Sequence, residues 1–470
     1  MARVISYKNY VGLALGSMIG IGWITVAGDW LIDGGPLGAI LAFLIGGFLL
    51  ITIGKCYAEL TPALPLAGGE LAFSYKAFGN LPSFLTTWFL AFAYICICPF
   101  ETVSISLLTD YILPELKSET LYIVGGYPIC YSSIIPGLAI GALIIALNFF
   151  GIKFSAIFQT IAIALIFLCV ACFTVAAFTK GSFSNMQPLF AHQGSWAAVP
   201  LSVIAVLGIV PFFMSGFDTI PQAAEESGLK VNPKDLGKAV VVSIFVGAIF
   251  YAVVIINLSI CIPWQEVTEY KTLPVVEAFS VAFGNEWITR LALLAAFLGL
   301  VTSFNGFFIA STRIIFSAGR GGLFPKWFSE IDKKHHTPKN AIWFVGFLSL
   351  IGPFIGRSAI LPICNVGSLA FVCAWFITCL AAIRLRKTAP NMKRPYKVKN
   401  ISTLYIGAII SAILILFLIV PGSSAQLVWP LEYLILIVWL RLGFAGFFVR
   451  QHSKDTTKEQ RDYLILGDYR

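Results

Sequence analysis

The stretch Gly16–Trp23, which reads GSMIGIGW, interrupts the first long apolar segment of this sequence with three glycines. Each glycine lowers helix stability by about 1 kcal/mol relative to alanine, so a break here costs little. A break in the middle of a membrane exposes backbone N–H and C=O groups, which is tolerated only where the segment is buried in protein or lines a cavity. The helix end after the break then offers free N–H groups and a positive dipole end to an anionic group.

The same glycines also fit a second interpretation, in which they are a packing surface. Gly12, Gly16 and Gly20 recur every four residues. Small residues at this spacing let two membrane helices approach closely. The first segment alone favours neither interpretation.

A second interrupted segment decides between them. Val210–Asp218 reads VPFFMSGFD, and Pro221 follows, so proline, serine and glycine interrupt another apolar span. This span comes five spans after the first. Paired interruptions at corresponding positions of two halves point to the binding site of a secondary transporter. The pattern predicts two inverted repeats of five helices each, with discontinuous helices 1 and 6.

The composition places the whole chain in a membrane. Hydrophobic residues make up 58% of it and charged residues only 12%, whereas soluble domains contain about 25% charged residues. Several windows contain no charge at all and reach the length of about 20 residues that a bilayer-spanning helix needs. Examples of such windows are 35–54, 77–100, 154–179, 239–265, 291–312 and 358–383.

We therefore predict an all-α membrane protein with about twelve transmembrane helices. Membrane β-strands are short and alternate apolar with polar residues, unlike these continuously apolar runs. The predicted spans are 10–33, 36–56, 81–108, 131–150, 154–178, 197–222, 239–262, 288–318, 341–356, 359–383, 401–420 and 427–449. The transporter domain would cover 1–450, with repeat one at about 10–178, repeat two at about 197–383 and two extra helices at about 401–449. Residues 451–470 would form a polar, partly disordered cytoplasmic tail, and 110–130 and 263–287 the larger outer loops.

The distribution of positive charge predicts the orientation of the chain. The net charge is +9, which by itself would also suit a nucleic-acid partner. If both termini are cytoplasmic, inner segments hold 26 of the 32 lysines and arginines and outer segments hold five. Basic residues accumulate on the cytoplasmic side of membrane proteins. The charge thus indicates a multi-pass protein of the cell membrane, which in a bacterium is the inner membrane. We expect the lipid bilayer to be its partner and expect no nucleic-acid partner.

Cysteine and histidine give no sign of a metal, a cofactor or a disulfide framework. Nearly all of the ten cysteines lie in or beside apolar windows, where a free cysteine is a small packing residue. The adjacent His335 and His336 have no further ligands at metal-binding spacing. The sequence also lacks the usual hydrolase, zinc-protease and nucleotide-binding motifs. We expect no cofactor, no metal and no enzymatic activity.

Several short motifs resemble the amino acid–polyamine–organocation family of permeases, which has the leucine-transporter-like fold. The resemblance extends from about Tyr7 to Lys387, and the order and spacing of its motifs are specific. The matching stretches are Gly16–Gly22; Tyr57–Leu60 with Pro65, Gly68-Gly69, Tyr75 and Phe78-Gly79; Gly216–Asp218 with Ala224–Glu226 and Asn232-Pro233; and Gly322–Pro325 with Thr337-Pro338 and Ala341. The resemblance implies transport of an amino acid or an amine.

The resemblance also implies where the substrate binds. Its carboxylate would meet backbone N–H groups near Gly20, Ile21 and Gly22, and its amino group would meet carbonyls near Ser17 and Phe212. The second break adds Ser215 and Gly216 to the predicted site. Phe212 and Phe307 match aromatic gating positions of the family. Two residues depart from its pattern: Ile21 stands where a small hydroxyl residue is common, and Trp23 where isoleucine or leucine is common. The indole is expected to narrow the site or shift substrate choice.

Two carboxyl groups lie within predicted spans, and buried charges in a membrane are costly and usually functional. Glu101 falls in helix 3, and Asp218 follows the break in helix 6 at a position that is often acidic in the family and linked to proton coupling. Burial away from water favours the protonated form of a carboxyl group, so either residue is a candidate for proton coupling or for contact with a substrate amine. A second group, Glu59, Glu70, Glu225 and Glu226, lies at inner helix ends and is interpreted as inner-gate or structural charges.

The coupling ion has three candidates. Proton symport is favoured, with exchange as the main alternative. Some proton-coupled relatives use a lysine on helix 5, but 154–179 contains no charge. Sodium stays an alternative, since Thr302 and Ser303 form an adjacent hydroxyl pair on helix 8 and hard cations prefer oxygen ligands. A channel, or a nutrient sensor that binds without transporting, is the remaining alternative for the chain as a whole.

Overall fold

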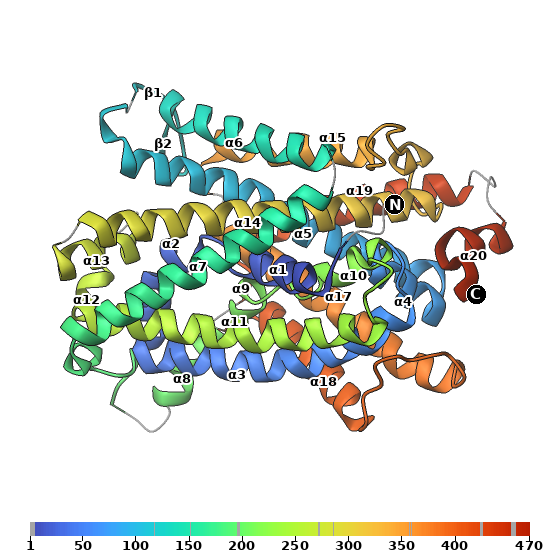
Figure 1. Ribbon diagram of the computed structural model, residues 1–470, viewed down its shortest axis with the longest axis horizontal. Coiled ribbons are helices and arrows are strands. Elements are labelled where there is room, and N and C mark those ends of the chain that lie inside the picture. Colours follow the sequence, from blue (N-terminus) through green and yellow to red (C-terminus); the bar gives the residue numbers. More distant parts are fainter. Residues whose placement is uncertain are drawn as a thin grey trace.

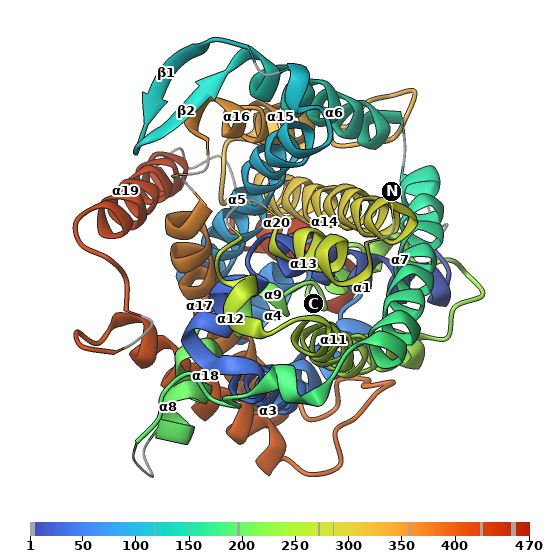
Figure 2. The same cartoon turned by 90° about the vertical axis from the view of Figure 1, so that its left-hand side faces the viewer.

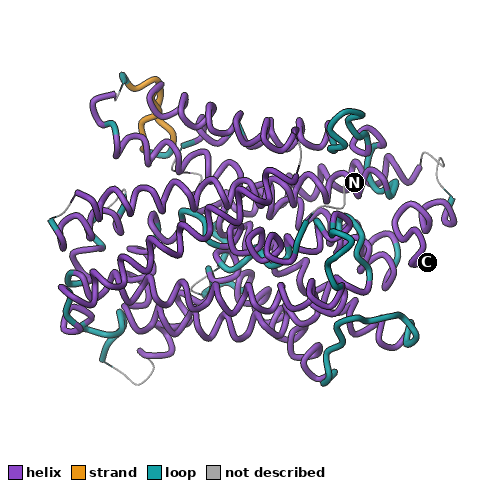
Figure 3. The backbone as a smooth tube through the Cα atoms, viewed as in Figure 1, coloured by secondary structure: helices purple, strands orange, loops and turns teal. Residues whose placement is uncertain are grey.

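The structure of the protein is a computed structural model, which describes residues 5–116, 118–150, 152–194, 198–270, 273–284, 286–356, 358, 360–423, 426–452 and 457–470. Helices make up most of these residues (Figure 3). The helices are α1 (Tyr7–Met18), α2 (Gly22–Thr25), α3 (Ala27–Ala63), α4 (Gly69–Phe78), α5 (Asn80–Ile112), α6 (Tyr131–Phe150), α7 (Ile152–Lys180), α8 (Ala198–Leu207), α9 (Val210–Phe213), α10 (Thr219–Gln222), α11 (Pro233–Cys261), α12 (Trp264–Val267), α13 (Pro274–Phe283), α14 (Glu286–Arg320), α15 (Lys339–Ser349), α16 (Gly352–Ile355), α17 (Ile360–Thr388), α18 (Ser402–Ile419), α19 (Leu431–His452) and α20 (Lys458–Leu466).

The long helices run side by side in one bundle, with α3, α5, α7, α11 and α14 along its full length (Figure 1). The N- and C-terminal parts of the chain lie toward the same end of this bundle, which we call the terminal end. The strands β1 (Thr120–Val124) and β2 (Tyr127–Cys130) form an antiparallel hairpin at the opposite end. Gly125 and Gly126 connect them with φ of 55° and 84°, the conformation that a tight two-residue hairpin turn requires.

The fold is that of an all-α membrane protein. Within the described ranges, nine helices are long and apolar enough to cross a bilayer, and three shorter apolar helices accompany them. Large apolar side chains such as Phe48, Leu143 and Leu168 are exposed on the outside of the bundle, as expected where lipid is the solvent. Three of the predicted spans fall on interrupted or short helices instead: 10–33 on α1, α2 and the start of α3; 197–222 on α8 to α10; and 341–356 on α15 and α16.

Both glycine-rich segments are interrupted. The first helix ends at Met18 and resumes at Gly22. The other interruption is longer, because helical structure stops at Phe213 and resumes at Thr219. Gly216 lies there with φ of 127°, and a Cβ on it would lie 2.7 Å from the backbone nitrogen of Met18. The two interruptions therefore touch, backbone against backbone.

Glycine packing is present in the same helix. Helix α1 lies near the centre of the bundle, surrounded by α7, α11 and α14 (Figure 2). A Cβ on Gly12 would lie 2.7 Å from Oγ1 of Thr160 on α7, and Gly16 packs as closely against Gln159. Both interpretations of the first segment thus apply: its earlier glycines allow close packing, and Gly20 and Gly22 lie at the break.

The C-terminal tail differs from the prediction of partial disorder. Residues 458–466 form α20, which begins with a capping box made by Thr457 and Gln460. The apolar side chains of Ile465 and Leu466 are buried in a cluster that includes Leu71 of α4. Capping and an apolar face together stabilise a short helix that would be marginal alone.

Candidate functional site

The first interruption leaves backbone donors free at the centre of the bundle. The structure shows no acceptor in the described part of the chain for the N–H groups of Gly20, Ile21 and Gly22. Buried backbone groups are almost always hydrogen-bonded in folded proteins. Three neighbouring unpaired N–H groups are therefore an unusual feature, and they suit a carboxylate, which accepts several hydrogen bonds at once.

A small cavity of about 20 Å³ lies between the two interruptions. A cavity of this size holds a water molecule or two at most, so larger contents require side chains to move. Seven residues predicted for the site line it: Ser17, Gly20, Gly22, Glu101, Phe212, Ser303 and Phe307. Apart from Gly20, which lies at the first break, they come from α1, α2, α5, α9 and α14, so residues as far apart as 17 and 307 meet at one point.

Glu101 faces the first break directly. Its side chain is buried, and Oε2 has no partner among the described residues. A Cβ placed on Gly20 would lie 2.8 Å from Glu101 Oε1 and 2.9 Å from Ser303 Oγ. The absence of a side chain at Gly20 is therefore what leaves space between the carboxyl group and the unpaired N–H groups.

The sequence did not predict Tyr251, which links the two breaks. Its hydroxyl lies 2.8 Å from the carbonyl oxygen of Met18 and 3.1 Å from that of Phe213. A phenol has one proton to donate, so the two carbonyls compete for it. The only local signal was a single tyrosine in the apolar helix α11.

The other lining residues that the sequence did not indicate are apolar. They are Met18, Ile97, Phe100 and Phe213. The Phe212 ring meets Phe100 and Phe213 edge-on, with centroids 5.8 Å and 5.3 Å apart. Aromatic rings thus close one side of the cavity, and nothing distinguished Phe100 and Phe213 in advance from the other phenylalanines among the 40 in the chain.

Asp218 lies outside the cavity lining. It is fully buried, and its Oδ1 and Oδ2 accept hydrogen bonds from Gly216 N at 2.9 Å and from Trp375 Nε1 at 2.8 Å. The carboxyl group thereby ties the second break to α17. Tyr94 of α5 also donates to the Asp218 carbonyl, at 3.0 Å. The contacts suit a group that controls the shape of the break rather than one that touches a ligand.

Five other predicted residues also lie outside the lining. Ser215 donates to the Phe212 carbonyl at 2.7 Å, and Gly216 packs on α1. Ile21 is buried, and the Trp23 ring meets Phe250, with centroids 5.8 Å apart.

Thr302, the fifth, is separated from its neighbour Ser303. Its hydroxyl bonds to carbonyls of its own helix, at Leu298 and Gly299, while Ser303 faces the cavity. Its carbonyl oxygen accepts the Gln159 amide at 2.7 Å.

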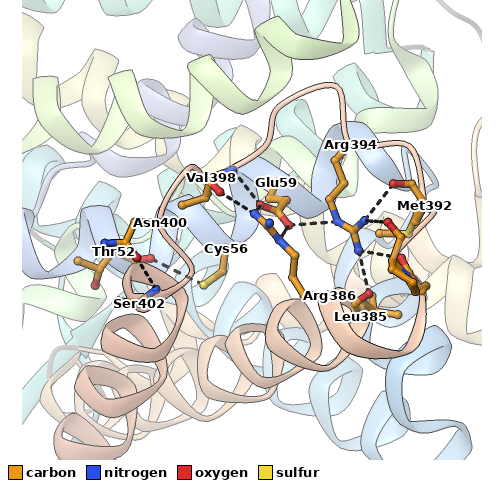
Figure 4. A network of polar contacts seen from close by, with 12 residues as sticks. Thr52, Cys56, Glu59, Leu385, Arg386, Met392, Arg394, Val398, Asn400 and Ser402 are labelled. Atoms are coloured by element: carbon orange, nitrogen blue, oxygen red, sulfur yellow. Dashed lines mark hydrogen bonds and ion pairs between the residues drawn. The ribbon is translucent and has the colours of Figure 1, made fainter.

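Ion pairs hold the terminal end of the bundle together. Glu59 of α3 binds two arginines: its Oε1 lies 2.6 Å from Arg386 Nε and 3.2 Å from Arg394 Nε (Figure 4). The backbone N–H of Val398 donates to its Oε2 at 2.9 Å. Figure 4 shows this carboxylate at the centre of a network that fastens α3 to α17 and to the loop that follows it.

Two further glutamates at the terminal end are paired in the same way. Glu225 lies 3.1 Å from Arg320, and Glu226 lies 3.3 Å from Arg313. Burial by itself would raise the pKa of Glu225, but the Arg320 guanidinium and the Ala67 N–H outweigh it and lower that pKa below its ordinary value. These pairs close the segment after α10 against α14.

Together these features define a class of protein: a multi-pass membrane transporter, in which two interrupted helices face each other across a central site. The family model described as "Amino acid permease" matches residues 5–441. The chain therefore belongs to the amino acid permease family, as the motif resemblance predicted.

Relatives support the assignment over nearly the full length. The chain is 28% identical to a branched-chain amino acid permease of Bacillus subtilis over 450 residues, which cover 94% of this chain and 92% of the relative. It is 24% identical to the methylthioribose transporter of the same organism, covering 96% and 95%. It is 24% identical to an aspartate–proton symporter, also of Bacillus subtilis, covering 99% and 88%. These relatives are permeases and transporters, not enzymes.

Proposed function

We propose that this protein is a secondary active transporter that carries an amino acid across the cell membrane by alternating access. One observation supports this most strongly: the N–H groups of Gly20, Ile21 and Gly22 have no acceptor in the described part of the chain, and Gly20 and Gly22 line a cavity at the meeting point of two interrupted helices. Half-helix ends at a midplane site are the usual substrate contacts of such carriers.

The substrate carboxylate would bind at these N–H groups. Its amino group would lie toward the carbonyls of α1 and α9 near Ser17 and Phe212, where Tyr251 now donates to Met18 and Phe213. Opposite half-helix ends carry opposite partial charges, so a zwitterion suits the pair. The cavity of about 20 Å³ has to widen on binding, and rotation of the Phe212 ring is the simplest way.

We further propose that transport is coupled to protons through Asp218. Its ionised carboxylate accepts from Gly216 and Trp375 at once. A protonated carboxyl group has a donor where one of these acceptors was, so protonation would release one of the two contacts. The second break would then loosen from α17. One relative is named as an aspartate–proton symporter, which favours protons over sodium.

The proposed topology has twelve crossings, with both termini in the cytoplasm. Repeats one and two would cover about 10–178 and 197–383, the extra helices about 401–449, and residues 451–470 the cytoplasmic tail. The predominance of lysine and arginine at the predicted inner ends supports this orientation. The terminal end, with its Glu59 and Glu225 ion pairs, would then be the inner gate.

The alternative function is exchange of one amino acid or amine for another without a coupling ion. It is favoured over sodium symport because the Thr302 hydroxyl bonds to carbonyls of its own helix, so that only Ser303 of the pair faces the cavity. A channel or a binding-only sensor is the weakest candidate, because neither needs two touching helix interruptions.

Purified protein in liposomes distinguishes these functions. A thermal-shift screen against amino acids and amines first identifies a ligand. Labelled ligand is then offered under an inward proton gradient, an inward sodium gradient, or with unlabelled ligand inside. Proton-driven accumulation that saturates with ligand supports the proposal. Uptake only in exchange for internal ligand supports the alternative, and ligand binding without any flux refutes transport.

A further inference from the structure

Glu70 is a second carboxyl group buried close to Asp218. It lies in the first turn of α4, and its side chain has no exposed surface. The Gln222 amide donates to its Oε2, while Oε1 has no partner in the described part of the chain. A buried carboxyl oxygen without a partner is costly, which calls for an explanation beyond packing.

Glu70 differs in this respect from the other glutamates at the terminal end. Glu59, Glu225 and Glu226 each have an arginine partner. Within the described ranges no lysine, arginine or histidine forms an ion pair with Glu70 or with Asp218. The sequence had grouped all four glutamates as gate or structural charges, and the contacts separate Glu70 from the rest.

The backbone around Glu70 connects it to the second interruption. A Cβ on Gly69 would lie 3.0 Å from the carbonyl oxygen of Pro221, so the start of α4 is pressed against α10. Asp218 and Gln222 are four residues apart and lie on one face of the turn. The contact between α4 and α10 thus has a buried carboxyl group on each side.

The helices α5, α10, α14, α17 and α20 pack against α4, which carries Glu70. Burial raises the pKa of Glu70 well above its ordinary value, and the Asp218 charge adds to this rise. Tyr57 of α3 acts in the opposite direction and lowers that pKa. Several other titratable groups on these elements have partners elsewhere: Tyr94 of α5 donates to the Asp218 carbonyl, Arg313 of α14 pairs with Glu226, Arg386 of α17 pairs with Glu59, and Asp462 of α20 accepts from Tyr75.

Two neighbouring carboxyl groups in a water-poor site, with no cation beside them, cannot both be ionised at low cost. The pair is therefore expected to hold one proton and one negative charge. Loss of that proton would put two negative charges on either side of the contact between α4 and α10. Repulsion would then push these elements apart at the terminal end.

We propose that Glu70 forms a proton-binding pair with Asp218, and that the proton they share holds α4 against α10 until its release opens the terminal end. This inference rests on the proposed proton coupling and adds a second residue to it. No other reactant is needed: the proton binds a carboxylate oxygen from one side of the membrane and leaves it to the other.

The substitution Glu70→Gln tests the charge without removing the hydrogen bond, since the new amide oxygen still accepts from Gln222. Proteoliposome uptake is measured between pH 5 and pH 8. Without the neighbouring negative charge, Asp218 is harder to protonate, so the pH of half-maximal uptake should fall by about one unit or more. Glu70→Asp keeps the charge, so its pH midpoint should stay at the wild-type value.

Glu225→Gln is the matched control, because it removes a terminal-end carboxylate that has its own arginine, and its pH midpoint should not move. The inference fails if Glu70→Gln keeps the wild-type midpoint, or if Glu70→Asp is impaired while Glu70→Gln is normal, which is the pattern of a packing role. Failure of the proposed function looks different: the wild type itself would then show no uptake driven by a proton gradient.

Discussion

Substitution of Gly20 by alanine gives the sharpest test of the binding site. The new Cβ would lie 2.8 Å from Glu101 Oε1 and 2.9 Å from both Ser303 Cβ and Oγ, closer than Cβ atoms approach other heavy atoms. It would also fill much of a cavity of about 20 Å³. Overpacking of this kind costs about 1–3 kcal/mol. Because a bound substrate would have to share the same space, a cost of this size borne by the complex alone corresponds to a loss of about 5- to 150-fold in substrate affinity.

The affinity is measured on purified protein by calorimetry, and as KM for uptake in proteoliposomes. Gly28→Ala is the matched control, because its Cβ would have no neighbour nearer than 3.6 Å and its affinity should stay within about twofold. Gly20→Leu should abolish binding. If Gly20→Ala binds substrate as tightly as the wild type while remaining folded, the carboxylate does not bind at this break.

Four further predictions address coupling, the cavity and the gate. Asp218→Asn should abolish uptake driven by a proton gradient and spare exchange; an unchanged pH dependence would assign coupling elsewhere. Glu101→Gln should lower substrate affinity more than it alters the pH profile of uptake. If Glu101→Gln instead loses proton-driven uptake while Asp218→Asn behaves like the wild type, proton coupling belongs to Glu101 on α5. Tyr251→Phe leaves two buried carbonyls without their donor, so it should destabilise the protein by about 1–3 kcal/mol, seen as a lower melting temperature; an unchanged temperature would count against the bridge. The pKa of the Glu225 carboxyl group is lower in the folded protein than in the unfolded chain. The ion pair therefore stabilises the fold fully above the pKa that Glu225 has in the unfolded chain, and this stabilisation is lost as the pH falls through its pKa in the folded protein. Glu225→Gln should therefore melt earlier than the wild type at pH 7, and the difference should shrink toward pH 4; a difference independent of pH would contradict the ion pair.

The sequence alone determined the features that depend on neighbours along the chain. A run of about 20 apolar residues is long enough to span a bilayer. It can do so as a helix, because a helix satisfies its own backbone hydrogen bonds. The all-α membrane class could therefore be recognised from hydropathy. Glycine and proline weaken a helix wherever they lie, so the interruptions after Met18 and Phe213 could be located without coordinates. The motifs around these breaks were enough to predict the family.

The features decided by tertiary structure depend on which residues of different helices face one another. Tyr251 reaches both breaks, and Asp218 turns away from the cavity toward Trp375, because of how α11 and α17 are rotated and packed. The same packing gives Glu59 two arginines and leaves Glu70 with none, although the two residues looked alike in sequence. Helix rotation and contact are set by side chains hundreds of positions apart, and no local pattern records them.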